Sequence, residues 1–182
     1  MNITVYCGSS FGNRDSYRAA AQELGQWIGS QGHTLVFGGG KIGLMGTLAD
    51  AVLASGGRVI GVIPEFLHTP EKTHTGLTAL YTVPSMAQRK AKMIELGEAF
   101  IALPGGPGTL EEISEVISLR RLGKTDAPCF FYNVDGYYDL METFFQQIND
   151  REFLAYPYTE IVHFPTSLAE LAAHLPAKSG NS

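Results

Sequence analysis

The chain contains little cysteine and no spacing of cysteine and histidine that is typical of a metal site. Its two cysteines, Cys7 and Cys129, both lie inside apolar, strand-like runs. The sequence has neither a C-x-x-C pair nor an H-E-x-x-H motif, and its five histidines are scattered. These observations argue against a zinc site and against a disulfide framework. We therefore expect a functional site without a metal ion.

The chain also lacks long apolar runs. No run approaches the ~20 apolar residues that a helix needs to span a bilayer. No signal peptide precedes residues 2–5, which already look like a strand. We expect a cytoplasmic protein with no membrane partner.

Positive charge is neither abundant nor clustered. The formal net charge is −5, and no Lys/Arg cluster is longer than a pair such as Arg120-Arg121. Nucleic acid is a poor candidate partner because its binding needs a basic surface. A small anion held by backbone N–H groups remains compatible with this composition.

The composition is otherwise that of one compact domain. Hydrophobic residues make up 45% of the 182 residues and charged residues 17%, which is ordinary for a globular chain. We expect a single nucleotide-binding domain over residues 1–176 and a frayed tail over residues 177–182.

Strand-like and helical patterns alternate along the chain. Several strands read as continuous apolar runs, which is typical of a parallel sheet that is buried on both faces. The pattern predicts a three-layer α/β fold in which helices flank a mostly parallel sheet. We expect the aromatic pairs Tyr137-Tyr138 and Phe144-Phe145 to lie in the core. Strands are predicted at 3–7, 34–37, 58–63, 80–83, 99–103, 128–132 and 161–164, and helices at about 15–31, 45–55, 85–96, 109–122, 137–148 and 168–175.

The central motif joins the apolar run 99–103 to a helical pattern through the sequence Pro104-Gly105-Gly106-Pro107-Gly108. A strand, a glycine turn and a helix start aim backbone N–H groups and the positive end of the helix dipole at an anion. Glycine is favoured there because a Cβ atom would block the approach of a phosphate. We predict a phosphate site in this turn.

Two further turns follow predicted strands and are expected to converge on the same edge of the sheet, where parallel α/β sheets bind ligands. One is the turn 8–10, and the other is the glycine-rich loop 38–46. The loop is not a dinucleotide fingerprint, because no acidic residue ends the next strand. It is either a tight strand-to-helix turn or part of the ligand site. The residues of these two turns that we place in the site are Gly8, Ser9, Gly39, Gly40, Gly43 and Met45.

Two sets of charged residues have both a structural and a functional interpretation. Thr109 and Glu112 have the spacing of a capping box, which alone would explain them as helix stabilisers. Alternatively, Glu112 faces the predicted anion site. Arg89 and Lys90 are either exposed helix surface or counter-charges for an anion or carboxylate near the start of their helix.

The chain resembles the LOG (Lonely Guy) family, whose members are often mislabelled as lysine decarboxylases. The resemblance runs from about residue 3 to residue 175. It rests on Pro104-Gly105-Gly106-x-Gly108-Thr109-x-x-Glu112, on Met86-x-x-Arg89-Lys90 upstream, and on the segments 7–10, 38–46 and 133–138.

The resemblance implies a Rossmann-like fold and a homodimer with active sites near the dimer interface. It implies hydrolysis of the N-glycosidic bond of a nucleoside 5′-monophosphate, either AMP or an N6-modified cytokinin riboside monophosphate, to free base and ribose 5-phosphate without a cofactor. The implied catalytic pair is Arg89 and Glu112. The implied substrate contacts are Glu71, Arg89, Lys90, Gly106, Pro107, Gly108, Thr109, Leu110, Glu111, Glu112 and Ser118, and we add Gly105 from the phosphate turn.

Three departures from the family pattern bear on substrate choice. Pro107 removes one N–H from the phosphate cradle, Lys41 follows the triple glycine, and residues 119–121 differ from the usual pattern. They leave open whether adenine or N6-isopentenyl-adenine is the preferred base.

Two other functions remain as alternatives. A non-catalytic carrier of a nucleotide or of molybdenum cofactor would keep the glycine loops without needing Arg89 and Glu112 together. An amino-acid decarboxylase would need pyridoxal phosphate on a lysine, for which Lys41 and Lys90 are the nearest residues.

Overall fold

The computed structural model describes residues 1–175, so the tail predicted at 177–182 and the last residue of the predicted domain lie outside the described residues. Six parallel strands form one sheet in the order β4-β3-β2-β1-β5-β6. The predicted parallel α/β architecture is confirmed. The strands are β1 (Asn2–Tyr6), β2 (Thr34–Phe37), β3 (Arg58–Pro64), β4 (Ala79–Val83), β5 (Ala99–Ala102) and β6 (Cys129–Phe131).

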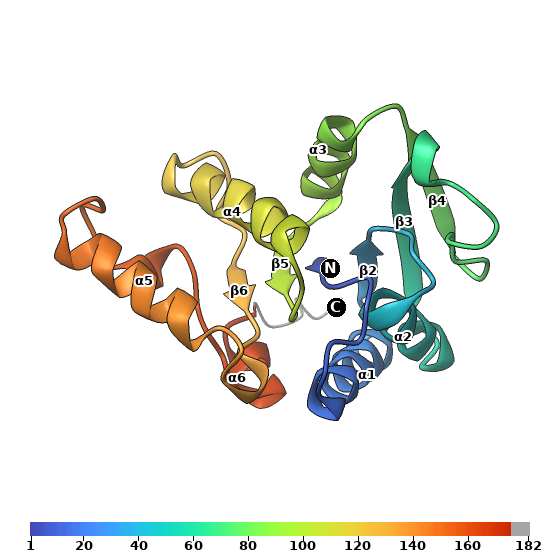
Figure 1. Cartoon of the computed structure of the whole chain (residues 1–182), viewed down its shortest axis with the longest axis horizontal. Coiled ribbons are helices and arrows are strands. Elements are labelled where there is room, and N and C mark those ends of the chain that lie inside the picture. The colour runs from blue at the N-terminus through green and yellow to red at the C-terminus, as the bar shows by residue number, and fades with distance from the viewer. Residues whose placement is uncertain (176–182) are drawn as a thin grey trace, which may run out of the picture.

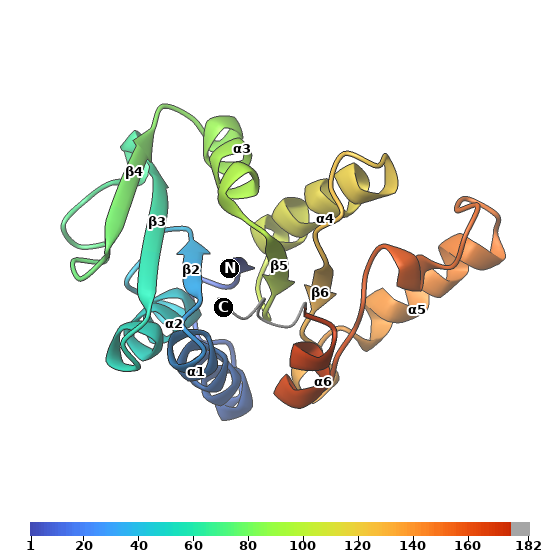
Figure 2. The same cartoon turned by 180° about the vertical axis from the view of Figure 1, so that it is seen from behind.

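Helices cover both faces of the sheet, as predicted. Figures 1 and 2 show α1, α2 and α6 on one face and α3 and α4 on the other. The helix α5 extends beyond the β6 edge. The helices are α1 (Asp15–Ser30), α2 (Gly43–Ala54), α3 (Met86–Leu96), α4 (Pro107–Arg121), α5 (Asp139–Asp150) and α6 (Leu168–Ala173).

The two apolar cores follow from the alternation of side chains along the strands. On β1, Ile3 and Val5 point into the core beneath α1 and α2, whereas Tyr6 points into the core beneath α3 and α4. On β5, Ile101 joins the first core and Phe100 joins the second. Every residue of β5 is buried, which explains why it reads as a continuous apolar run.

The strand order places a switch point between β1 and β5. The chain builds outward from β1 to β4 and then crosses back through α3 to pair β5 with the other side of β1. The connections on the two sides of this point leave in opposite directions, so the carboxyl ends of β1 and β5 border a crevice. This crevice is where the site is found.

Several predicted elements differ from the structure. The segment 161–164 is not a strand, because His163 makes a single bridge to Phe130 before Pro165 removes the next donor. The helix predicted from 137 begins at Asp139, after a short 3₁₀ turn at Val134–Gly136. Tyr138 is buried in the core as predicted, but Tyr137 and Phe144 are exposed by 42% and 57%. In residues 1–175, no helix is long and apolar enough to cross a membrane.

Candidate active site

Three loops pack against one another at the carboxyl ends of β1, β2 and β5. The amide of Gly8 donates to the carbonyl of Pro104 at 3.1 Å, and the amide of Leu44 donates to the carbonyl of Ser10 at 3.4 Å. Gly43 has a φ of +67°, and a Cβ atom on it would lie 2.4 Å from the carbonyl carbon of Ser9. Gly43 is therefore required by the packing of the loops, not by a ligand.

The start of α4 corrects one of our two interpretations of Glu112. The helix begins at Pro107 with Gly106 as its N-cap, so Thr109 is the third helical residue and is not a cap. The capping-box interpretation is wrong. Proline is favoured at the first helical position because the N–H that it lacks has no partner within the helix.

The first turn of α4 presents open backbone to solvent. The amides of Gly108 and Thr109 belong to the first turn, whose N–H groups have no intrahelical acceptor. A Cβ atom on Gly106 or Gly108 would have no heavy atom within 4 Å. These two glycines thus differ from Gly43, since the fold itself leaves room for a side chain at both.

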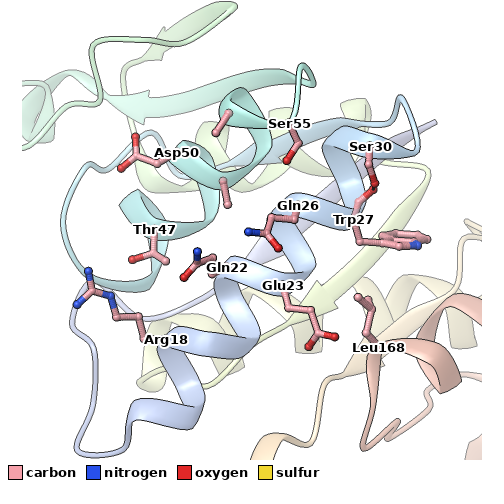
Figure 3. Close-up of a pocket in the computed structure, with 12 residues that line it drawn as sticks. Arg18, Gln22, Glu23, Gln26, Trp27, Ser30, Thr47, Asp50, Ser55 and Leu168 are labelled. Atoms are coloured by element: carbon pink, nitrogen blue, oxygen red, sulfur yellow. The ribbon is translucent and has the colours of Figure 1, made fainter.

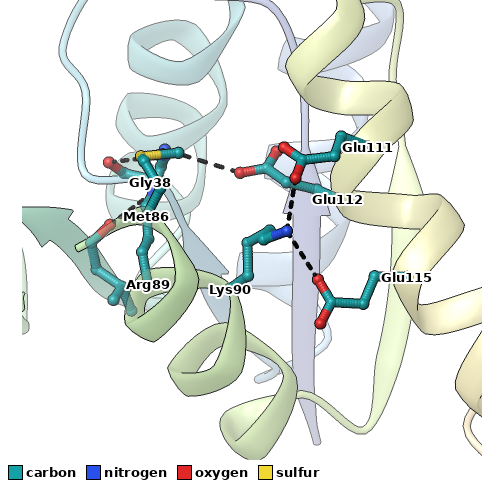
Figure 4. Close-up of polar contacts among 8 residues, drawn as sticks. Gly38, Met86, Arg89, Lys90, Glu111, Glu112 and Glu115 are labelled. Atoms are coloured by element: carbon teal, nitrogen blue, oxygen red, sulfur yellow. Dashed lines mark hydrogen bonds and ion pairs between the residues drawn. The ribbon is translucent and has the colours of Figure 1, made fainter.

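Arg89 and Glu112 form a buried ion pair beside this turn. Their side chains are exposed by only 9% and 10%, and Arg89 Nη1 lies 3.7 Å from Glu112 Oε1 (Figure 4). Arg89 is fixed from the other side: its Nε donates to the carbonyl of Val62 at 3.2 Å, and its Nη2 donates to the carbonyl of Gly38 at 3.3 Å. The guanidinium is therefore held by β3 and the second glycine loop, and it leaves the Glu112 carboxylate free of a short hydrogen bond to it.

The pKa of Glu112 is raised above its ordinary value, and burial is the largest of the opposing causes. Burial raises the pKa of Glu112, the positive charge of Arg89 lowers it, the negative charge of Glu111 raises it and Lys90 lowers it. A buried carboxylate is costly unless a counter-charge is present. Arg89 supplies that charge permanently, because a guanidinium does not lose its proton in a protein.

Two adjoining cavities open at this crevice. The first, of about 290 Å³, is lined by Cys7, Glu112 and the start of α4. The second, of about 440 Å³, is lined mainly by apolar side chains, among them Ile42, Ile63 and Leu67. Ser9, Met45 and Arg89 line both cavities.

The structure brings most of the predicted site residues together. The first cavity is lined by Gly8, Ser9, Met45, Arg89, Gly106, Pro107, Gly108, Thr109, Glu111 and Glu112, and Gly40 lines the second. Gly105 and Leu110 line neither cavity. The carbonyl of Gly105 accepts a hydrogen bond from the hydroxyl of Tyr137, and Leu110 packs into the core.

Other predicted residues lie outside both cavities. Glu71 is exposed on the connection between β3 and β4, and Ser118 is exposed on α4, about 9 Å further along the helix axis than Glu112. Gly39 contacts the same connection through its carbonyl, which accepts from the amide of His74. Lys90 lines neither cavity, but it pairs with Glu111, which lines the first cavity, and with Glu115.

Sequence reasoning missed several lining residues. Cys7 and Met86 line the first cavity, and the carbonyl of Gly38 accepts a hydrogen bond from Arg89. A Cβ atom on Gly38 would overlap the Arg89 guanidinium. Ile63 and Leu67 line the apolar cavity. Cys7 and Ile63 come at or directly after strand carboxyl ends, which is a signal that the sequence offered. Within residues 1–175, no group of three or more His, Cys, Asp or Glu side chains is placed to hold a metal ion.

A larger hollow lies elsewhere among the described residues. A groove of about 850 Å³ runs between α1 and α2 and is lined by side chains such as Arg18, Glu23 and Asp50 (Figure 3). It is on the face of the sheet opposite α3 and α4.

The comparisons with known proteins agree with the motif. A family model described as "Possible lysine decarboxylase" matches residues 45–175. A cytokinin riboside 5′-monophosphate phosphoribohydrolase from Rhodococcoides fascians is 51% identical over 138 residues, which cover 75% of this chain and 70% of that protein. The enzyme of the same name, LOG1, from Arabidopsis thaliana is 44% identical over 173 residues, which cover 95% and 81%. The chain belongs to the LOG family.

Solved structures show the LOG fold in more distant proteins. The molybdenum cofactor carrier protein from Chlamydomonas reinhardtii matches with a TM-score of 0.71, at 20% identity and over 94% of this chain and 93% of that one. A molybdenum cofactor binding protein from Rippkaea orientalis matches with a TM-score of 0.66, at 19% identity and over 87% and 91%. At these identities the likeness concerns the fold alone.

Proposed function

We propose that this LOG-family chain hydrolyses the N-glycosidic bond of a nucleoside 5′-monophosphate and releases the free base and ribose 5-phosphate. The observation that carries the proposal is the buried Arg89–Glu112 pair, 3.7 Å apart, in the wall of the cavity that also contains the open start of α4. Relatives at 44–51% identity bear the name of this activity.

The start of α4 is the proposed phosphate site. Gly106, Gly108 and Thr109 line the first cavity, and the amides of Gly108 and Thr109 have no acceptor within the helix, which supports an anion site there. A phosphate bound there fixes the far end of the nucleotide and so positions C1′ beside the carboxylate. Pro107 takes the position whose N–H could not bond within the helix, so two amides remain for the phosphate.

Glu112 is the proposed catalytic carboxylate. Cleavage of the C1′–N bond builds positive charge on the ribose, and a carboxylate beside C1′ stabilises that charge or orients the attacking water. For this role Glu112 must be ionised despite its burial. The positive charge of Arg89 favours the ionised form, and the position of Arg89 is fixed by Val62 and Gly38.

The apolar second cavity is the proposed base site. It adjoins the reaction cavity at Ser9, Met45 and Arg89, and Ile42, Ile63 and Leu67 form much of its wall. Such a lining supports a base with an apolar N6 substituent over an unsubstituted adenine, because apolar surface gains free energy on leaving water. We propose AMP as the weaker substrate.

The decarboxylase alternative loses the two lysines named for it, although a third lysine, Lys72, lines the second cavity. Pyridoxal phosphate would need a free lysine at the site. Lys41 Nζ donates to the carbonyl of Pro70 at 2.7 Å, and Lys90 Nζ is bound by Glu111 at 2.6 Å. Neither residue lines the two cavities. The carrier alternative needs the glycine turns but not the buried Arg89–Glu112 pair.

A homodimer is part of this proposal. The resemblance places Glu71 and Ser118 on the substrate, yet both lie outside the cavities of their own chain. A second copy would be the means of bringing them to the site. Elution of the purified protein at the mass of a single chain would contradict this assembly. The cytoplasmic location stays a prediction.

Product analysis tests the reaction. The purified protein is incubated with AMP and, separately, with isopentenyladenosine 5′-monophosphate, and the mixtures are separated by chromatography. We expect free base and ribose 5-phosphate from both, with a higher kcat/KM for the isopentenyl compound. Tight binding without base release would favour the carrier, and a preference for AMP would refute the assignment of the apolar cavity.

A further inference from the structure

Lys90 follows Arg89 on α3, but its ion-pair partners differ from those of Arg89. Lys90 lies on α3, and its ammonium spans to two carboxylates of α4, at 2.6 Å from Glu111 Oε1 and 3.1 Å from Glu115 Oε2 (Figure 4). Its side chain is exposed by 17%, and it does not line the reaction cavity. The ammonium thus donates a hydrogen bond to Glu111 and forms an ion pair with Glu115.

The two partners of Lys90 lie one helical turn apart. Residues at i and i+4 are neighbours on a helix surface, so Glu111 and Glu115 flank the ammonium from both sides. Glu111 is 60% exposed, whereas Glu115 is 42% exposed and its Oε2 atom is buried. Within residues 1–175, this Oε2 atom has no hydrogen bond of regular geometry, so the ion pair to Lys90 is what compensates it.

Together these residues set the charge around Glu112. From α3, Arg89 pairs with Glu112 itself, whereas Lys90 pairs with Glu111 and Glu115, the neighbours of Glu112 on α4. From the sheet, Tyr6 and Cys7 are buried next to it and remain protonated, since burial and the Glu112 charge raise the pKa of both. Three carboxylates therefore share two cations, and Arg89 already serves Glu112.

We infer that Lys90 is a positioning residue, not a phosphate ligand: by pairing with Glu111 and Glu115 it neutralises the acidic face of α4 and keeps Glu112 ionised. This assigns a role to Glu115 as well, because Glu115 is the second carboxylate that the ammonium compensates. The inference rests on the proposed function for its catalytic meaning, but the charge compensation exists with or without substrate.

The direction of the effect follows from the neighbours of Glu112. Lys90 lowers the pKa of Glu112 and Glu111 raises it. Removing the ammonium leaves two uncompensated carboxylates, which disfavour a third negative charge. Removing Glu115 instead leaves Lys90 in surplus and favours the ionised form of Glu112.

The test compares Lys90→Met, Glu115→Gln and the double variant with the parent. Lys92→Met is the matched control, because Lys92 is also a paired lysine on α3, at 2.7 Å from Glu95. The first readout is the titration of the Glu112 side-chain carboxyl by ¹³C NMR in the ligand-free protein. The second is the pH dependence of kcat, with KM measured alongside, using isopentenyladenosine 5′-monophosphate.

We expect Lys90→Met to move the Glu112 titration midpoint, and the acid limb of kcat, upward by at least about half a pH unit, which is less than the 1–3 units of a charge in direct contact. Glu115→Gln moves both downward, the double variant returns them towards the parent, and Lys92→Met moves neither. KM changes less than about threefold.

An unchanged Glu112 midpoint in both Lys90→Met and Glu115→Gln would overturn the inference. So would a tenfold or greater rise in KM for Lys90→Met that Glu115→Gln does not relieve, since that is the signature of a lost phosphate ligand. If the parent hydrolyses no nucleotide, the proposed function fails while the NMR titration still decides the role of Lys90.

Discussion

Two hollow regions of this molecule make an instructive comparison, because, among the described residues that line them, the smaller one has the buried charges and the larger one does not. The groove between α1 and α2 has a volume of about 850 Å³, whereas the cavity at the start of α4 has about 290 Å³. The large groove is formed by the outer side chains of two packed helices, such as Gln22, Glu23 and Gln26, which are exposed. The small cavity contains a buried arginine, a buried glutamate and free backbone amides.

The difference shows what marks a site in this fold. Charges on an exposed helix surface are solvated and cost the fold little. A buried Arg–Glu pair costs desolvation free energy that a hydrophobic pair would not. The stability of the fold therefore does not explain the pair, and a functional role does. In the small cavity the pair borders an anion-binding helix start, and in the groove no buried ion pair is found among the described residues that line it.

Glu112→Gln should give the largest contrast between the two regions. It removes the negative charge beside C1′ but keeps the shape of the side chain, so kcat should fall by at least about a hundredfold, or about 2.7 kcal/mol. Glu23→Gln is the matched change in the groove and should alter kcat by less than twofold. Steady-state kinetics on both variants, with thermal unfolding to confirm folding, checks this. A Glu112→Gln variant within tenfold of the parent would remove the catalytic assignment.

Two glycine substitutions give a smaller contrast within the site itself. Gly108→Ala places a methyl group in open space where the phosphate should approach, so KM should rise by about tenfold while the fold is kept or slightly stabilised, by up to about 1 kcal/mol. Gly43→Ala forces a left-handed residue with a Cβ atom against Ser9 and should destabilise the fold by at least about 1–3 kcal/mol.

Chemical denaturation and KM values separate the two glycine variants. If Gly108→Ala binds nucleotide as the parent does, the phosphate does not lie at the start of α4. If Gly43→Ala is as stable as the parent, the close packing of the loops at Ser9 is not essential.

The fold was largely predictable because its signals are local. The continuous apolar run of β5 ends at a glycine turn, and that turn opens α4. Ser85 and Gln88 have the spacing of a capping box, and the Ser85 hydroxyl accepts from the amide of Gln88. The segment 161–164 looked like a further strand because its apolar residues fill the core beside β6, but core filling does not require a ladder.

The site was predictable only where one element supplies it. The start of α4 follows from its own sequence, although Pro107 and not Thr109 begins the helix. Arg89 donates hydrogen bonds to the carbonyls of Val62 and Gly38. These three residues are far apart in the sequence, so no local pattern predicts the contacts. Lys90 and Arg89 are adjacent in sequence and look equivalent there. In the structure, Arg89 pairs with Glu112, whereas Lys90 pairs with Glu111 and Glu115. The placement of α3 against α4 decides these partners.

A crystal structure of the Glu112→Gln variant soaked with AMP is the most direct test of where the chemistry takes place. We predict the phosphate on the amides of Gly108 and Thr109, C1′ beside the side chain of residue 112, and adenine in the cavity lined by Ile42, Ile63 and Leu67. Nucleotide bound in the groove between α1 and α2, or with its phosphate on Lys90, would contradict this account.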